Sequence, residues 1–138
     1  MIPRYAGFRQ RTAAALADIA ILNVIETFIF APLGWEWLSA PPEDLAWRTP
    51  LLILLGVPLL YDTVLTSSRR QATWGKRFIG LYVADLNGDR LSPWHAAFRH
   101  LVKYVTAATL AVGVLIQPFT YRKQALHDLL SRTVVRER

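Results

Sequence analysis

The sequence predicts an all-α membrane protein that forms a single domain over residues 1–138. We expect two full transmembrane helices, an interfacial helix that leads into a re-entrant or third transmembrane element, and a small β-hairpin. Of the 138 residues, 53% are hydrophobic and 12% are aromatic, which is high for a soluble domain of this size. The apolar residues gather in three blocks, and the segments outside them hold nearly all the Lys and Arg. Hydrocarbon about 30 Å thick requires roughly 17 to 25 helical residues, and the first two blocks reach that length.

The first block covers about 12–33 and carries Asp18, Asn23 and Glu26 in its interior. The basic tail before it gives it some likeness to a signal peptide. These polar residues interrupt the apolar run, however, and the run is too long for a signal peptide. We therefore expect the block to stay in the mature protein as a membrane span.

The charges between the blocks predict the orientation of the chain. The tail before the first block carries three arginines and no acid, whereas residues 34–49 have a formal charge of −2. The positive-inside rule then places the N-terminus in the cytoplasm and residues 34–49 outside, where their three tryptophans suit the membrane interface. Pro50 begins the second span, about 50–66, because proline fits the first turn of a helix.

Residues 67–100 form the longest polar segment and carry a formal charge of +4, which places them on the cytoplasmic side. Within this segment, the stretch LYVADLNGDRL, residues 81–91, alternates between apolar and polar side chains up to Asn87-Gly88. That pair is the one that best adopts a type I′ turn. The stretch therefore predicts a cytoplasmic β-hairpin.

A helix is expected after Ser92-Pro93, because serine is a favoured N-cap and proline suits the first turn. Its apolar side chains, such as Trp94 and Phe98, share one face, so the helix is expected to lie in the membrane interface. Basic side chains in this helix and in the segment before it are expected to contact lipid headgroups. These residues are Lys76, Arg77, Arg99 and Lys103.

The third apolar block, about 101–120, is predicted to re-enter the membrane, although a third full span is the alternative. Its uncharged part is only about 15 residues long, with Gly113 near the middle and Pro118 near the end. A full span would place the tail, residues 121–138 with a charge of +3, outside the cell. With the tail inside, the β-branched run at 133–135 is placed to pair with a strand at 81–83.

The acids inside the spans are the main candidates for a site, because a buried ionisable residue is expensive unless it is paired or hydrated. Antiparallel packing of the first two helices would place Asp18 and Asp62 at a similar depth near the inner leaflet. The nearest cations in the sequence are Arg11, Arg69 and Arg70. Two interpretations remain open: an ion-pair network that holds the helices together, and a transport or binding site.

Several other kinds of site are not expected. The chain has no cysteine, and its three histidines lack the spacing of metal ligands, so no metal or other cofactor is expected. No nucleophile is paired with a base, which argues against an enzyme. The basic residues flank apolar blocks instead of covering one face of a soluble fold, so a nucleic-acid partner is not expected either.

Three segments, in this order, resemble the RDD family of small bacterial membrane proteins: YAGFRQRTAAALADIAIL, TWGKRFIGLYVADLNGDRLSPWHAAFRHLVKY and QALHDLLSRTVV. The likeness covers nearly the whole chain. It implies that Arg11, Asp18 and Asp128 are the residues for which the family is named, and that Asp128 could meet Arg11 at the inner surface. One departure is Ser131-Arg132, where the family usually has a small residue followed by glycine.

The resemblance implies a multi-pass protein of the bacterial cytoplasmic (inner) membrane, with both termini in the cytoplasm. Our first hypothesis is an ion-coupled or small-solute transport component, with a cation or proton as one candidate solute, acting as a homo-oligomer. The alternative is an accessory or regulatory subunit that docks a larger membrane enzyme or transporter, and the third hypothesis is a protein that binds or handles anionic lipid. The expected partners are the lipid bilayer and further copies of this chain. The residues expected in the transport site or polar junction are Arg11, Asp18, Glu26, Asp62 and Asp128.

Overall fold

The computed structural model describes residues 4–31, 48–108 and 115–138. The fold is mostly helical and has a small antiparallel sheet of two strands. The elements, in chain order, are α1 (Phe8–Phe30), α3 (Arg48–Thr66), α4 (Trp74–Phe78), β1 (Leu81–Asp85), α5 (Pro93–Ala108), η2 (Gln117–Phe119), α7 (Leu126–Leu130) and β2 (Thr133–Glu137).

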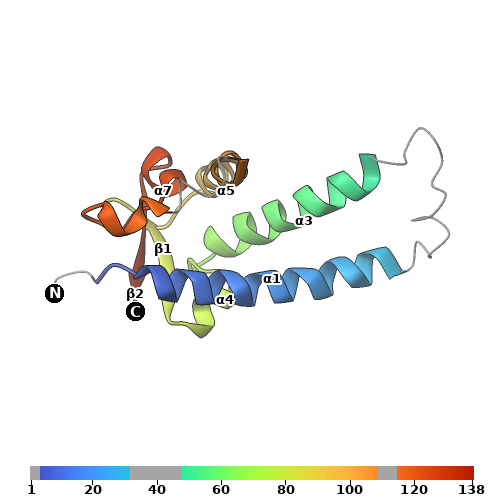
Figure 1. The fold of residues 1–138 in the computed structure, drawn as a ribbon, viewed down its shortest axis with the longest axis horizontal. Coiled ribbons are helices and arrows are strands. Elements are labelled where there is room, and N and C mark those ends of the chain that lie inside the picture. Colours follow the sequence, from blue (N-terminus) through green and yellow to red (C-terminus); the bar gives the residue numbers. More distant parts are fainter. Residues whose placement is uncertain (1–3, 32–47, 109–114) are drawn as a thin grey trace.

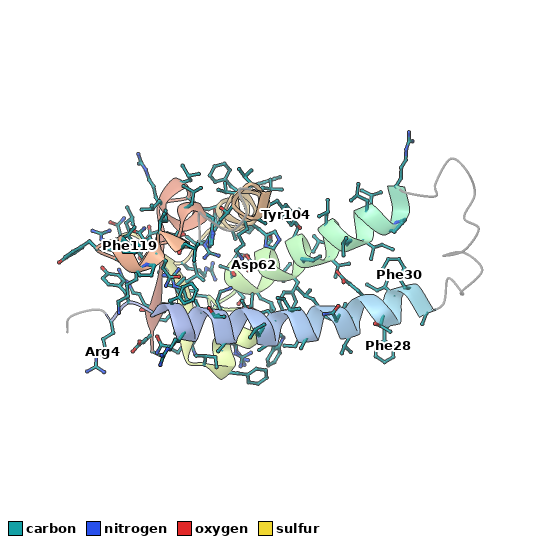
Figure 2. The ribbon with its side chains drawn as sticks, in the orientation of Figure 1. Arg4, Phe28, Phe30, Asp62, Tyr104 and Phe119 are labelled. Atoms are coloured by element: carbon teal, nitrogen blue, oxygen red, sulfur yellow. The ribbon has the colours of Figure 1, made fainter. Side chains whose placement is uncertain are left out.

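The long helices α1 and α3 extend together away from a cluster of short elements (Figure 1). That cluster contains α4, α5, α7 and both strands, and the first described residues, before α1, lie beside it. Phe28 and Phe30 mark the far end of α1, whereas Asp62 lies next to the cluster (Figure 2). The buried polar side chains described below all lie at the clustered end.

Helix α1 is long and apolar enough to cross a membrane, and among the described residues it is the one helix that meets both conditions. In its most apolar stretch only 6% of the residues are buried against the rest of the protein, so this stretch faces outward. The apolar part of α3, Pro50–Thr66, is shorter. The expectation of two full spans is therefore supported for α1 and is not confirmed for α3.

The sheet pairs β1 with β2, with Val83 opposite Val135. The run at 133–135 does pair with the strand that begins at Leu81, as predicted, but it lies opposite residues 83–85. The predicted hairpin over 81–91 is wrong. After β1 the chain turns around the carboxylate of Asp85, which accepts hydrogen bonds of 2.8 Å from the backbone N–H groups of residues 87–89. The side chain takes these donors, so the following residues form a local turn of the Asx kind instead of a second strand.

The first described residues pair with the last strand. Tyr5 forms a bridge with Arg136, and the backbone N–H of Ala6 donates to the carbonyl of Val135 at 3.0 Å. The N–H of Glu137 donates to the carbonyl of Arg4 at the same distance. The two ends of the chain are thus tied to each other by backbone hydrogen bonds.

Helix α5 begins as the sequence predicts, because Ser92 Oγ accepts the backbone N–H of His95 at 3.2 Å. Its apolar face is exposed, and Trp94 is 86% exposed. The opposite face packs on α3 and α7 and carries buried polar residues. The predicted third membrane element at 101–120 lies partly outside the described residues, since 109–114 are not described.

Candidate functional site

The carboxylate of Asp18 in α1 is held by neutral donors. Tyr61 donates its hydroxyl to Oδ1 at 2.8 Å, and Thr73 donates its hydroxyl to Oδ2 at 2.6 Å. The backbone N–H of Gly75 also donates to Oδ1 at 2.8 Å. Thr73 and Gly75 belong to the first turn of α4, so Asp18 accepts donors that this helix end would otherwise leave free.

Glycine at position 75 allows α4 to lie against α1. A Cβ atom there would overlap the carbonyl oxygen of Ala14 and would lie 2.7 Å from Cγ of Asp18. A larger residue would therefore push the end of α4 away from the carboxylate that it binds. The family-like stretch TWGKRF thus serves to bind Asp18 closely.

Asp62 in α3, which is 4% exposed, is surrounded by cations and a histidine. One oxygen, Oδ1, lies near two lysines from different helices. The other, Oδ2, lies near α5. The distances are 2.8 Å to Lys103 Nζ, 3.4 Å to Lys76 Nζ, 3.4 Å to His100 Nδ1 and 3.9 Å to Arg99 Nη1.

Asp128 in α7 is completely buried and binds two arginines. Its Oδ1 accepts hydrogen bonds from Arg99 Nη2 at 2.6 Å and Nε at 3.1 Å, and its Oδ2 forms an ion pair with Arg11. Burial alone would raise the pKa of Asp128, but the charges of Arg99 and Arg11 outweigh it and hold the pKa below its usual value. Asp128 is therefore an anion at neutral pH.

Arg99 joins the two acidic centres, because it binds Asp128 and faces Asp62 while being only 1% exposed. We call the resulting group of charged residues the polar junction. It contains four cations and three carboxylates, so its formal charge is +1. Its members are Arg11, Asp18, Asp62, Lys76, Arg99, Lys103 and Asp128.

The two histidines beside the polar junction add no charge at neutral pH. Burial lowers the pKa of His127 to about 3, because the neighbouring Asp128 offsets only part of the desolvation. Burial also lowers the pKa of His100 below its usual value. Both rings are therefore neutral, and the polar junction keeps its positive charge.

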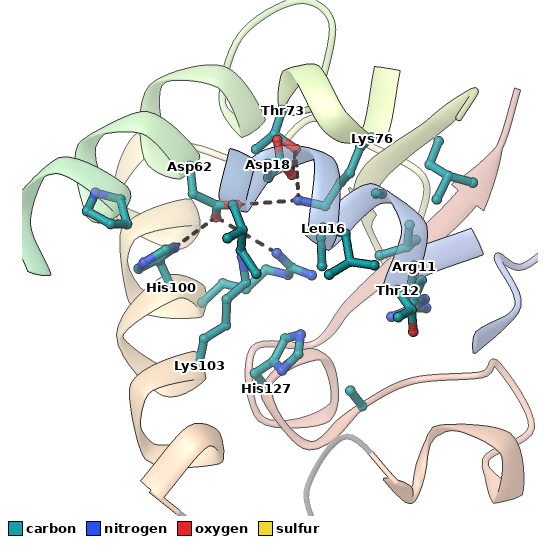
Figure 3. Close-up of a pocket in the computed structure, with 18 of the residues that line it drawn as sticks. Arg11, Thr12, Leu16, Asp18, Asp62, Thr73, Lys76, His100, Lys103 and His127 are labelled. Atoms are coloured by element: carbon teal, nitrogen blue, oxygen red, sulfur yellow. Dashed lines mark hydrogen bonds and ion pairs between the residues drawn. The ribbon is translucent and has the colours of Figure 1, made fainter. Parts of the chain in front are cut away.

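A cavity of about 540 Å³ lies at the polar junction (Figure 3). Lys76, His100, Lys103 and His127 lie around it, together with Asp18 and Asp62. Apolar residues such as Phe8, Leu16 and Val135 line the cavity beside the charged groups. Further along α1 and α3 the lining consists of Ile19, Leu22 and Pro58.

Several buried N–H groups of lining residues have no hydrogen-bond partner within the part of the chain that the structure describes. They are Nη1 of Arg99 and Nε and Nη2 of Arg11. A buried donor without a partner is unfavourable by about 1–3 kcal/mol, and more when it is charged. An anion in the cavity would supply acceptors for these donors.

The structure brings most of the predicted residues together, but with different partners. The expected contact between Arg11 and Asp128 is present. Asp18 and Asp62 line the same cavity, one bonded to neutral groups and the other to cations. Glu26 is not among the described residues that line this cavity.

The prediction of which cations lie near Asp62 was wrong for two residues. Arg69 and Arg70 are exposed and do not line the cavity, because the chain turns away after α3. Their place is taken by Lys76, Arg99 and Lys103, which the sequence analysis assigned to lipid headgroups. The fourth residue of that group, Arg77, instead lies over the ring of Trp74 at 4.3 Å from its centroid.

Sequence reasoning missed Tyr61, Thr73, Gly75 and His100. A signal existed for three of them, since Thr73, Gly75 and His100 lie in the family-like segment TWGKRFIGLYVADLNGDRLSPWHAAFRHLVKY. Tyr61 carried no such signal, because it lies outside the family-like segments and acts through a contact with α1.

The comparison with known proteins identifies the family. The model of the RDD family matches residues 5–132, which is nearly the whole chain. The chain belongs to the RDD family. Uncharacterized protein YxaI of Bacillus subtilis (strain 168) is 31% identical to this RDD protein over 91 residues, which are 66% of this chain and 60% of that relative. The chain thus matches less than two thirds of that relative's length, and no solved structure matches this RDD protein.

Proposed function

We propose that this RDD protein is a small-solute transport component of the bacterial cytoplasmic membrane whose polar junction binds an anion. The observation that carries the proposal is the cavity at the polar junction, where cations outnumber carboxylates and arginine N–H groups lack hydrogen-bond partners among the described residues. Buried charges are normally paired. An anionic ligand would neutralise the remaining charge and bind the free donors.

A cation is a poorer fit to the same cavity. The carboxylate of Asp18 already accepts three hydrogen bonds, and those of Asp62 and Asp128 already face lysine and arginine. At Asp18, at Asp128 and at Oδ1 of Asp62, a metal ion or proton would have to displace these donors. Oδ2 of Asp62 accepts no hydrogen bond from the described residues, but Arg99 Nη1 lies 3.9 Å from it, so a cation there would meet a positive field. Within the transport hypothesis, the geometry therefore favours an anionic solute over a cation.

The pairing of the two chain ends supports a topology with α1 and α3 as spans and both termini in the cytoplasm. Tyr5 and Arg136 must lie on the same side of the membrane, because they pair through their backbones. The chain between them then crosses the membrane an even number of times. Two crossings satisfy this rule if residues 101–120 re-enter without crossing, and the basic flanks favour the cytoplasmic side for the ends.

A single copy with two spans is too small to enclose a path for a solute, so we propose a homo-oligomer. The outward-facing stretch of α1 supports this, because only 6% of it is buried within one copy. Small residues such as Ala13 and Ala17 in this helix permit close packing of helices in a membrane. A larger membrane protein seated on the same face is the alternative, in which the chain acts as an accessory subunit.

Calorimetry with inorganic phosphate as the probe tests the anion site. The protein is placed in nanodiscs of neutral lipid, and the wild type is compared with Lys103→Gln, which removes a cation from the polar junction. The matched control is Arg77→Gln, which removes the same charge outside it. We expect binding to the wild type and to Arg77→Gln, with affinity for Lys103→Gln reduced roughly tenfold or more. If phosphate binds to none of the three proteins, the wild type included, the anion site is refuted.

Transport itself is tested in proteoliposomes loaded with a pH-sensitive dye or with labelled phosphate. We expect phosphate movement that requires Lys103, and no proton or sodium flux that requires Asp18. Proton or sodium flux that disappears in Asp18→Asn, with both proteins folded, would overturn the anion proposal in favour of the cation hypothesis. Phosphate binding without movement would favour the accessory subunit.

A further inference from the structure

We infer that the ligand of the polar junction is an amphiphile, a phosphate group joined to a hydrocarbon tail. This inference rests on the proposed function, because it names the chemical class of the anion. The phosphate would lie among the cations of α1, α4 and α5, and the tail would run along the apolar lining between α1 and α3.

The donors at the polar junction suit a phosphate group better than a carboxylate. N–H groups without a hydrogen bond belong to two side chains on two helices, Arg11 in α1 and Arg99 in α5. A carboxylate has only two oxygens in one plane, whereas a phosphate presents its oxygens in several directions. Arginine and lysine are also the usual binders of phosphate in proteins. The formal charge of +1 matches a phosphodiester, which carries one negative charge.

The site is built into the fold and is not a patch of surface cations. Arg99 is 1% exposed and His100 is 7% exposed, and both line the cavity. Arg99 is fixed on its other side by Asp128 and by the hydroxyl of Thr133 at 3.1 Å. Its Nη1 is therefore held in place, 3.9 Å from Oδ2 of Asp62 and without a hydrogen bond among the described residues.

The size and shape of the cavity argue for a ligand with a tail. A volume of about 540 Å³ falls in the range of cavities that hold whole organic ligands, whereas one water occupies about 30 Å³. The apolar lining by Ile19, Leu22 and Pro58 leads away from the charges, along helices that we place in the membrane. Leu16 and Ile19 are also largely exposed, so the apolar part of the cavity opens toward the surroundings of α1. A hydrocarbon chain in the inner leaflet could enter from that side.

The test compares a lipid probe with water-soluble probes for the same protein. Nanodiscs of phosphatidylcholine with a minor fraction of phosphatidylglycerol supply the amphiphile, and native mass spectrometry counts the lipid retained. Inorganic phosphate and glycerol phosphate are then titrated as competitors. We expect phosphatidylglycerol to be retained at least roughly tenfold more strongly than either soluble competitor, because burial of each CH₂ group adds about 0.8 kcal/mol.

Substitutions separate the two halves of the site. Ile19→Ala shortens an apolar side chain in the lining, whereas Val24→Ala makes a similar change on α1 outside it. We expect Ile19→Ala to weaken lipid retention roughly three- to tenfold without changing phosphate binding, and Val24→Ala to change neither. Lys103→Gln should weaken both the retention of phosphatidylglycerol and the binding of phosphate. Lys103→Arg, which keeps the charge, guards against a loss due to misfolding and should retain both.

The outcomes distinguish this inference from the proposed function. Equal affinity for phosphatidylglycerol and for soluble phosphate would overturn the amphiphile while leaving the anion site intact. If oleate, a carboxylate with a tail, is retained more strongly than phosphatidylglycerol, the inference that the charged group is a phosphate is overturned. If neither lipid nor soluble phosphate binds, both the inference and the proposed function fail. Strong retention of phosphatidylglycerol that depends on Lys103 and on Ile19, but not on Val24, supports the inference.

Discussion

Replacing Gly75 with alanine should separate α4 from α1 and release the carboxylate of Asp18. The new Cβ atom would overlap the carbonyl oxygen of Ala14 and lie 2.7 Å from Cγ and 2.8 Å from the backbone nitrogen of Asp18. Two of these three atoms are backbone atoms of a helix, which cannot rotate aside. The end of α4 must therefore move away, and the hydrogen bond from Gly75 N to Asp18 is lost.

The expected size of this effect follows from the contacts that are broken. Forcing an extra methyl group into a packed contact is unfavourable by about 1–3 kcal/mol. A hydrogen bond to a charged group contributes about 1.5–3 kcal/mol, and Thr73 is expected to lose part of its bond to Asp18 as well. We expect Gly75→Ala to lower the free energy of unfolding by about 2–4 kcal/mol. In a domain of this size, that is a fall in melting temperature on the order of 10 °C.

The assay is thermal unfolding in detergent micelles, followed by circular dichroism, with Gly56→Ala as the matched control. A Cβ atom at position 56 meets no other atom within 4 Å. Gly56 also lies inside helix α3, where alanine is favoured over glycine by up to about 1 kcal/mol. The two substitutions should therefore shift stability in opposite directions. Equal melting temperatures for the two variants would refute the close contact between α4 and α1.

Three further predictions can be checked by the same unfolding assay. Arg132 has a φ of 51° at the position where the family usually has glycine, so Arg132→Gly should stabilise the fold by about 1 kcal/mol, whereas Arg132→Ala should not. Asp18→Asn replaces one acceptor oxygen with an N–H donor that faces other donors and should destabilise by about 1–3 kcal/mol, whereas the exposed Asp89→Asn should have little effect. Stability should fall on acidification below about pH 6.5, because the unfolded chain binds a proton at His127 that the folded chain, with a pKa of about 3, does not bind. His127 contributes a slope of about 1.4 kcal/mol of unfolding free energy per pH unit, and Asp128 adds to the loss of stability below about pH 4. If the slope of stability against pH were unchanged in His127→Gln, this account would be contradicted.

The elements whose signals are local could be predicted from the sequence. The length and apolar character of α1 and the Ser92 cap of α5 are properties of single segments. The pairing of β2 with β1 followed from a β-branched run together with the charge of the tail. The hairpin prediction failed because Asn87-Gly88 favours a turn in either case, and the side chain of Asp85 decided which turn formed.

The polar junction could be predicted only in part. The family likeness gave Arg11, Asp18 and Asp128, but not which groups each of them binds. Asp62 was assigned the cations nearest in sequence, whereas Lys103, its closest partner, lies 41 residues away. Helix α4, strand β1 and the first part of α5 separate these residues in the chain, and their contact depends on how α5 packs on α3. Sequence spacing within one helix carries no information about such contacts between helices.

The contact between Arg11 and Asp128 also limits the order in which the protein can assemble during synthesis. These residues are 117 positions apart, so Arg11 has emerged from the ribosome long before its partner exists. Insertion of α1 must therefore begin while Arg11 is still bound to water or to headgroups. Arg99 is likewise left without Asp128 until α7 has been made. A chain cut short before α7 would carry an inserted helix beside an open, charged inner end, which is a feature that membrane proteases could use to recognise incomplete copies.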